Sequence, residues 1–257
     1  MKNIIIASIL FMSFCSFSMD TEQSKYQKAS LLNEEANHYS SLEDGNYDFK
    51  KSIELYEQAI KENYYPSYYN YYITCKNEKK NHCDMSTAIG YLEIAAENGI
   101  AEAQNELGSI YWNGVYRNKN IDNALKWYEL SAKNGSYYGS YNVGRILYIY
   151  KNKPEESRGY LEVAVKENVI PAKDLLARYL LEYGNKGNDD FLAVSYLKEA
   201  SDEGYAKSMY RLALCYIYGV GVNKNIQIAR ELLKSSEYGG VEESKEILDK
   251  LESGEFD

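Results

Sequence analysis

The chain has 257 residues, of which 29 are basic and 38 acidic, and its formal net charge is −9. Nucleic-acid binding needs a basic surface that neutralises phosphates, so this balance argues against a nucleic-acid partner and suits a protein partner with a basic face. Tyrosine occurs 28 times, and its ring can fill a seam between helices while its hydroxyl faces water or a partner.

The N-terminal residues 1–18 have the pattern of a secretory signal peptide. Lys2 precedes an apolar run that ends at Phe17, and the small residue Ser18 fits a cleavage site. A membrane-spanning helix needs about 20 apolar residues, and this run is shorter. No other stretch is apolar enough to span a bilayer. We therefore expect one mature domain over 19–257, in the periplasm or outside the cell.

A lipid anchor at Cys15 is the alternative to a soluble exported chain. Lipoprotein processing usually accepts a smaller residue than Phe14 directly before the modified cysteine. Cleavage near Ser18 therefore fits the leader better than lipidation does.

After Met19 the sequence repeats a pattern of two amphipathic helices, which residues 101–136 show most fully. Each helix has apolar residues at helical spacing. The second helix follows Asn120, whose side chain can accept a hydrogen bond from the first free backbone N–H groups. Gly135 ends the unit, because a residue without Cβ adopts the left-handed conformation freely.

The helix-ending residue recurs at spacings of 36, 36, 33, 36 and 36 residues, and it is always Gly or Asn: Asn63, Gly99, Gly135, Asn168, Gly204 and Gly240. Small residues lie four positions earlier, at Ala59, Ala95, Ser131, Ala164, Ala200 and Ser236, and eleven positions earlier, at Ser52, Ala88, Ala124, Ser157, Ala193 and Ala229. Large residues lie eight positions earlier, at Leu55, Tyr91, Trp127, Tyr160, Tyr196 and Leu232. The expected helix starts are the N-caps Asp48, Asp84, Asn120, Asp189 and Asn225, and Pro154 in the shortened fourth repeat. These columns predict a solenoid in which each unit packs on its neighbours.

These residues resemble the Sel-one-like repeat, a relative of the tetratricopeptide repeat with a longer unit. The family pattern is matched by Leu107, Gly108, Tyr111, Gly114, Ala124, Trp127 and Tyr128, and again by Leu212, Ala213, Tyr216, Gly219, Val220, Gly221, Val222, Ala229 and Leu232. The resemblance covers roughly residues 29 to 252. It implies an all-α fold, a right-handed superhelical solenoid of about six helix-turn-helix repeats plus a C-terminal capping helix. It also implies a protein-binding scaffold, and it does not imply an enzyme.

Three cysteines remain after the leader. In an oxidising exported setting Cys75 and Cys83 can close a short loop, which predicts a disulfide, with two unpaired thiols as the alternative. Together with His82 they offer three potential metal ligands, but their spacing matches no zinc motif. Cys215 lies beside Tyr216 and is expected to be a small buried side chain.

The sequence offers little support for catalysis. His38 and His82 lie in different repeats without a nucleophile motif nearby, so a Ser-His-Asp or Cys-His arrangement is poorly supported. The glycines at 219 and 221 follow a predicted helix rather than a strand, which favours an inter-helix turn over a phosphate loop. We therefore predict no catalytic residues, no metal and no cofactor.

Helix geometry joined to the family resemblance predicts a partner-binding face. In tetratricopeptide-like solenoids the first helix of each pair lines the concave side, and its outward positions lie two before, two after and five after the conserved Leu position. The predicted partner-binding residues are Tyr69, Ile73, Asn105, Ser109, Trp112, Tyr141, Arg145, Tyr148, Asp174, Arg178, Leu181, Tyr210, Leu214 and Ile217. Aromatic residues and arginine are frequent in this set, as they are in binding hot spots.

The resemblance to exported bacterial Sel-one-like proteins implies a specific role, that of an immunity protein. Such a protein would neutralise a secreted effector toxin of lipase type, which a contact-dependent system delivers into the periplasm. A secreted virulence or host-interaction factor is the alternative. Relatives rich in cysteine also suggest a penicillin-binding or weak β-lactamase-like hydrolase, which this sequence supports less. The sequence identifies neither the partner nor the oligomeric state.

Overall fold

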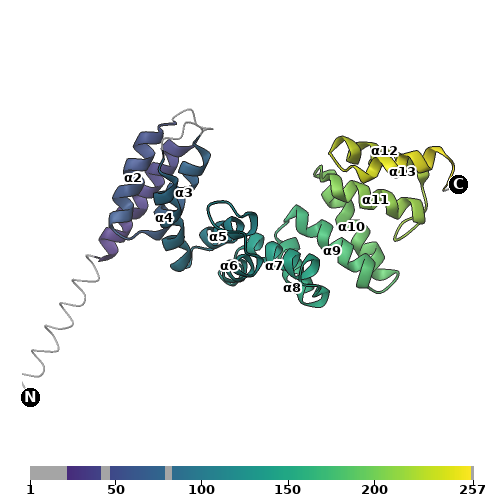
Figure 1. Ribbon diagram of the computed structural model, residues 1–257, viewed down its shortest axis with the longest axis horizontal. Coiled ribbons are helices and arrows are strands. Elements are labelled where there is room, and N and C mark those ends of the chain that lie inside the picture. Colours follow the sequence, from purple (N-terminus) through teal and green to yellow (C-terminus); the bar gives the residue numbers. More distant parts are fainter. Residues whose placement is uncertain (1–21, 42–46, 79–82, 256–257) are drawn as a thin grey trace, which may run out of the picture. The chain divides into compact units, whose positions relative to one another are not determined.

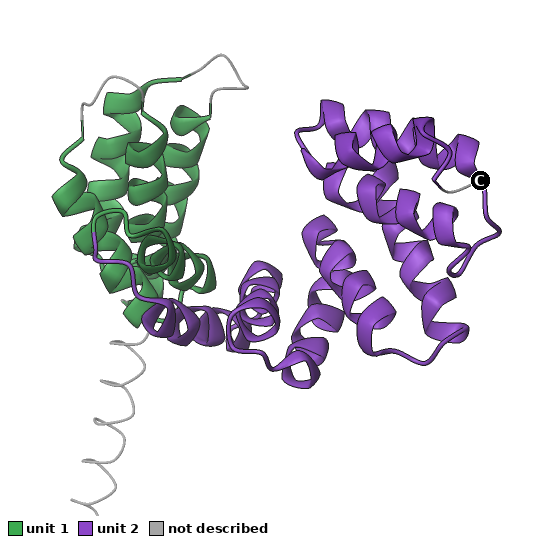
Figure 2. Cartoon of the chain, turned by 45° about the vertical axis from the view of Figure 1, so that its right-hand side comes forward, with its two compact units in different colours: residues 1–116 green, residues 117–257 purple. Residues whose placement is uncertain are grey.

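The structure is a computed structural model that describes residues 22–41, 47–78 and 83–255, and the predicted signal peptide lies outside these ranges. Regular structure in the described residues is entirely helical, and successive helices pack on each other within each unit. The fold is therefore an all-α repeat solenoid, as predicted (Figure 1). The chain forms two compact units, residues 1–116 and 117–257 (Figure 2), so the single domain over 19–257 stays a prediction.

Unit 1 contains a helical stretch over residues 22–40 followed by four further helices. They are α2 (Phe49–Lys61), α3 (Tyr65–Asn77), α4 (Met85–Glu97) and α5 (Ala101–Asn113). Unit 2 contains α6 (Ile121–Lys133), α7 (Tyr137–Ile149), α8 (Pro154–Lys166), α9 (Ile170–Tyr183), α10 (Asn188–Asp202), α11 (Ala206–Tyr218), α12 (Ile226–Tyr238) and α13 (Glu243–Glu252). We call the first helix of each pair the A helix and the second the B helix, so that α3, α5, α7, α9 and α11 are A helices.

The backbone confirms every predicted end of a B helix. All six positions have positive φ angles, which are 56° at Asn63, 85° at Gly99, 93° at Gly135, 59° at Asn168, 83° at Gly204 and 88° at Gly240. Only Gly and, less readily, Asn adopt this conformation at small cost. The spacing of Gly and Asn in the sequence therefore sets the length of each repeat.

The predicted helix starts are confirmed with one exception. The side chains of the N-caps Asp48, Asp84, Asn120 and Asn225 accept backbone N–H hydrogen bonds in the first turn, and Pro154 is the first residue of α8. Asp189 was expected to be the N-cap of α10, and this is wrong. The helix begins at Asn188 after Gly187, and Asp189 instead accepts a hydrogen bond from the backbone N–H of Asn185 at 2.7 Å. The Asp189 carboxylate thus stabilises the turn before α10 and does not cap the helix.

The small residues four and eleven positions before each helix end have no exposed surface at all. They allow close approach of the next A helix. At Gly139 of α7, for example, an added Cβ atom would lie 2.7 Å from the Ser131 hydroxyl of α6. The large residues eight positions before the helix end are half-buried in five of six repeats. The fully buried large residues lie seven before it, at Tyr56, Leu92, Tyr128, Leu161, Leu197 and Leu233, each 1% exposed or less. Positions eleven, seven and four before the end lie on one stripe of the helix, which explains why the residue at position seven is the fully buried one.

Candidate protein-binding face

Most of the predicted partner-binding residues lie at the surface of their own unit and are half-buried. In unit 1 these are Tyr69 and Ile73 on α3, and Asn105, Ser109 and Trp112 on α5. In unit 2 they are Tyr141 and Arg145 on α7, Arg178 and Leu181 on α9, and Tyr210 and Leu214 on α11. We call the unit 2 set the A face of unit 2, and these residues can contact a partner without unfolding.

Three predicted partner-binding residues are buried, which corrects their expected outward position. Asp174 is 4% exposed because it accepts hydrogen bonds from Ser208 at 2.9 Å and from Arg211 at 2.8 Å, both on the next A helix. The ring of Tyr148 is covered by the neighbouring A helix, and Ile217 belongs to the apolar cluster that contains residues of α12 and α13. These side chains hold helices together and have little exposed surface to offer a partner.

In unit 1, the predicted face combines tyrosine with acidic neighbours. Burial and the carboxylates of Glu106 and Glu102 raise the pKa of Tyr69 to about 12. Glu106 also forms an ion pair with Lys76 at 2.6 Å. The Tyr69 hydroxyl therefore stays protonated at neutral pH and can donate a hydrogen bond.

The structure also places Cys75, at the end of α3, next to Cys83 in disulfide geometry, with the Cα atoms 5.5 Å apart. Cys215 is buried and unpaired, as expected. Whether Cys75 and Cys83 are oxidised depends on the compartment, so the bond itself stays a prediction.

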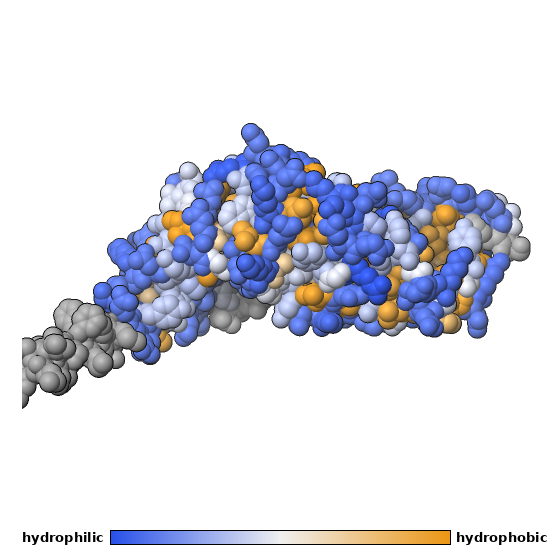
Figure 3. All heavy atoms as spheres, turned by 90° about the horizontal axis from the view of Figure 1, so that it is seen from below, coloured by the Kyte–Doolittle hydropathy of each residue, from blue (hydrophilic) through white to orange (hydrophobic). Residues whose placement is uncertain are grey.

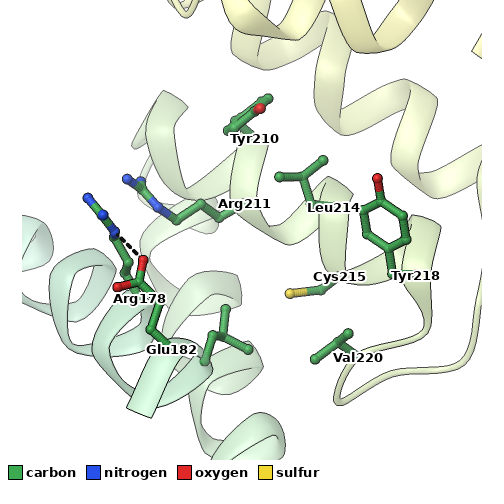
Figure 4. Close-up of a pocket in the computed structure, with 9 residues that line it drawn as sticks. Arg178, Glu182, Tyr210, Arg211, Leu214, Cys215, Tyr218 and Val220 are labelled. Atoms are coloured by element: carbon green, nitrogen blue, oxygen red, sulfur yellow. Dashed lines mark hydrogen bonds and ion pairs between the residues drawn. The ribbon is translucent and has the colours of Figure 1, made fainter. Parts of the chain in front are cut away.

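In unit 2, a hollow of about 330 Å³ lies between α9, α11 and the loop after α11. Four predicted residues line it, namely Arg178, Leu181, Tyr210 and Leu214. The lining also includes five residues that the sequence analysis did not select: Glu182, Arg211, Cys215, Tyr218 and Val220. Figure 4 shows the two arginines on one side of the hollow, Tyr218 on the other, and Leu214 and Cys215 between them.

Ion pairs fix the arginine side of this hollow. The Nε of Arg178 donates to Glu182 at 2.8 Å, and Glu182 also accepts from the Tyr148 hydroxyl at 2.5 Å. Burial opposes ionisation of Glu182, but these two donors outweigh it and hold the pKa of Glu182 below its usual value. The Arg178 guanidinium lies 5.2 Å from the centre of the Tyr148 ring, which adds a cation–π contact. The carboxylate is therefore charged at neutral pH and keeps Arg178 in place.

One of the missed lining residues has a signal in the sequence. Glu182 follows Arg178 by four residues, the spacing of a helical ion pair, and both face the same way. Arg211 lies one residue before the Leu position, where the outward-position rule predicts no contact with a partner. Its contact with Asp174 spans 37 residues and could not be derived from helical spacing within one helix.

On the side drawn in Figure 3, hydrophobic residues form separate patches among hydrophilic ones. Within the described ranges no group of three His, Cys, Asp or Glu side chains could hold a metal ion, and His82 lies outside them. None of the described helices is long and apolar enough to cross a membrane.

The helix pairs, their Gly and Asn stops and the aligned buried columns define an α-solenoid repeat protein. The family model described as Sel1 repeat matches residues 38–64, 79–100, 101–136, 171–205 and 206–240. These segments make up more than half of the chain, which therefore belongs to the Sel1 repeat family. Its repeats form a scaffold for protein–protein interaction, and family members are generally non-enzymatic.

A putative Sel1-like repeat-containing protein, L21 of Acanthamoeba polyphaga mimivirus, is 34% identical over 159 residues, which are 59% of this chain and 29% of that protein. Among solved structures, c5321, a protective antigen present in uropathogenic Escherichia coli strains, is similar with a TM-score of 0.72 and 20% identity, over 91% of this chain and 52% of that one. The immunity protein PA5088 of Pseudomonas aeruginosa has a TM-score of 0.51 and 16% identity, over 88% and 82% of the two chains. At these identities the solved structures show a common fold alone. The chain spans about half the length of c5321 and less of the viral protein.

Proposed function

We propose that this chain is a non-enzymatic scaffold that binds another protein through the A face of unit 2. The observation behind the proposal is that aromatic rings, arginines and an apolar hollow occur together on successive A helices of one unit. Trp, Tyr and Arg dominate binding hot spots because they bury a large area and form directed hydrogen bonds. A helix face that meets only water would instead be expected to contain mainly Lys, Glu and Gln.

The specific role that we assign is that of an immunity protein for a periplasm-acting effector of lipase type. The leader pattern of residues 1–18 supports export to the compartment where such an effector acts. The net charge of −9 supports a partner with a basic face, since opposite charges speed association. A structural neighbour named as an immunity protein agrees with this role, but it contributes only the fold.

Binding through the A face is tested by substitution. A pull-down from native lysate with the exported chain would first identify the partner. We expect Tyr141→Ala and Arg145→Ala each to weaken binding of that partner by about 1–4 kcal/mol. Tyr238→Ala is the matched control, because Tyr238 is a tyrosine that is 97% exposed on the B helix α12. Wild-type binding by both variants, with unchanged circular dichroism, would place the interface elsewhere.

The immunity role needs a separate test in cells. Expression of the identified effector in the periplasm is expected to stop growth, and co-export of this chain is expected to restore it. Arg145→Ala, which is expected to weaken binding of the effector, should restore growth less well than the wild-type chain. The control Tyr238→Ala should restore growth as the wild-type chain does. A partner of host origin, or growth arrest that the chain does not relieve, would favour the host-interaction alternative.

A further inference from the structure

The hollow in unit 2 has an apolar lining with a polar end. Leu181, Leu214, Val220 and the thiol of Cys215 supply apolar surface. The thiol stays neutral, because burial raises the pKa of Cys215 to about 11. The guanidinium groups of Arg178 and Arg211 lie together on one side (Figure 4), so a ligand would meet apolar atoms and hydrogen-bond donors at once.

Neither arginine uses all of its donors within the protein. An arginine has five N–H donors on three nitrogens. Arg178 pairs with Glu182 through Nε, and its two Nη atoms have no hydrogen-bond partner among the residues that the structure describes. Arg211 uses Nη1 for Asp174 and for the Lys207 carbonyl, and its Nε and Nη2 have no partner in the same ranges. Donors on both groups are therefore available to an incoming carboxylate.

The charges around the hollow would orient such a ligand. Asp174 and Glu182 are already engaged, since each accepts from one arginine and one hydroxyl group. At the Tyr210 side, burial and the carboxylates of Glu243 and Glu246 on α13 raise the pKa of Tyr210, so this side is acidic. A carboxylate would therefore be repelled from α13. At the arginine side, where each arginine is balanced by one carboxylate, the unused N–H donors would hold it.

The size of the hollow limits the ligand to a few side chains. Its volume of about 330 Å³ is at the lower end of ligand pockets, which measure about 300–1,000 Å³. We propose that the hollow binds an extended segment of a partner protein in which an apolar side chain stands next to an Asp or Glu. The apolar side chain fills the space against Leu214, and the carboxylate accepts hydrogen bonds from Arg178 and Arg211. This inference rests on the proposed function, because it specifies what the A face of unit 2 recognises.

Short labelled peptides test the recognition directly on the purified chain. The first probe is a peptide of sequence Gly-Ser-Leu-Glu-Ser-Gly, labelled at its N-terminus with a dye that has no carboxylate and amidated at its C-terminus, so that its only carboxylate is the Glu side chain. Its fluorescence anisotropy is expected to report a dissociation constant below about 1 mM. Replacing its Glu by Lys, or its Leu by Ser, is expected to weaken binding more than about tenfold. Higher salt is also expected to weaken binding, because salt screens the charge pairing.

Variants of the chain locate the peptide. Arg178→Gln is expected to weaken binding about fivefold or more. Its matched control is Arg158→Gln on α8, because Arg158 pairs with Glu162 four residues later at 2.7 Å, just as Arg178 pairs with Glu182, but lies outside this hollow. Leu214→Ser removes apolar lining and is expected to weaken binding to a similar degree. Circular dichroism confirms that each variant is folded.

Three results would overturn the inference. The first is equal binding of the Lys peptide, and the second is equal weakening by Arg158→Gln and Arg178→Gln. The third is self-association of the chain that Leu214→Ser abolishes in sedimentation, which would make a second copy the occupant. If no peptide binds while Tyr141→Ala still weakens binding of the identified partner, the inference fails and the proposed function stands.

Discussion

The two units join successive A helices by a polar contact at equivalent repeat positions, but unit 1 uses neutral groups and unit 2 uses ions. In unit 1, the side-chain oxygen of Asn33 accepts hydrogen bonds from Ser67 at 2.9 Å and from Asn70 at 3.0 Å. Asn33 is buried, and Ser67 has no exposed surface. Both donors belong to the next A helix, α3, so the contact ties one repeat to the following one.

In unit 2, Asp174 stands in place of Asn33. It accepts from Ser208 at 2.9 Å and from Arg211 at 2.8 Å, and the donors lie 34 and 37 residues further along the chain. These separations are the same as those from Asn33 to Ser67 and to Asn70. The repeat therefore keeps the position and the geometry of the contact while its charge changes.

The difference teaches that one repeat position can hold either a neutral or an ionic contact between successive A helices. The amide pair in unit 1 faces inward and needs no counterion. The carboxylate in unit 2 requires a cation, and Arg211, which supplies it, also lines the hollow. A buried charged contact is weak evidence for stability, but it holds the guanidinium in one place. Unit 2 thus has a charged side chain that lines the hollow at a position that in unit 1 joins two helices through neutral groups.

Removal of the acceptor in each unit should show the largest difference between them. Asp174→Ala leaves Arg211 and Ser208 without their buried partner, and such a loss costs about 3–5 kcal/mol. Asn33→Ala leaves only neutral donors unpaired, which costs about 1–3 kcal/mol. Urea unfolding followed by circular dichroism measures both. Equal losses in free energy of unfolding would show that charge makes no difference at this position.

The disulfide should stabilise unit 1 only. In exported protein, Cys75 and Cys83 are expected to be bonded, and reduction of a disulfide in a small exported domain costs about 2 kcal/mol or more. Hydrogen exchange should become faster in α3 and α4 after reduction and stay unchanged in α9 and α11, because repeats interact only with their neighbours. Peptide mapping that finds both thiols free in exported protein would contradict this prediction. Protein kept in the cytoplasm provides the reduced reference.

A conversion of the ionic contact to the neutral one sharpens the comparison. In a chain with both Asp174→Asn and Arg211→Asn, unit 2 has the chemistry of unit 1 at this position. Replacement of both members of a buried ion pair is often close to neutral, so we expect a stability change of about 1 kcal/mol or less. Binding of the acidic peptide to the hollow should nevertheless decrease. A stability loss as large as that of Asp174→Ala would show that the neutral geometry does not form in unit 2.

Much of the fold could be predicted because it depends on residues with special backbone or size requirements. The residues that end the B helices have positive φ, which favours Gly and Asn, and the small residues that pack against the next helix have no exposed surface. Both requirements recur once per repeat, so both leave a periodic signal in the sequence. The start of α10 could not be found in this way, since Gly187, Asp189 and Asp190 compete for the same turn. The Asp189 carboxylate, two residues after Gly187, accepts a backbone N–H hydrogen bond in this turn, as an N-cap side chain does at a helix start.

The candidate site was predicted less completely than the fold. The rule for outward positions found Leu181 and Leu214, which line the hollow, but it also selected Asp174, which is buried. That rule treats one helix at a time. Burial of Asp174 depends on Ser208 and Arg211 in the following repeat. To predict it, one must know which positions of two successive repeats face each other.

The smallest expected effect is the loss of the Glu182 charge in unit 2 at low pH, since the neutral Asn33 contact of unit 1 has no charge to lose. Because the pKa of Glu182 is lower in the folded chain than its usual value, its charge stabilises the fold above the unfolded pKa of about 4.3. This contribution is lost as pH falls through the lower, folded pKa. It should amount to only about 0.5 kcal/mol, because the side chain is 40% exposed and solvent screens the pair with Arg178. Urea unfolding of wild type and Glu182→Gln should therefore differ at pH 7 and converge near pH 3. The Asn33 contact of unit 1 does not titrate, so Asn33→Ala should lose the same free energy at both pH values. A difference between wild type and Glu182→Gln that persists at pH 3 would mean that Glu182 acts through packing instead of charge.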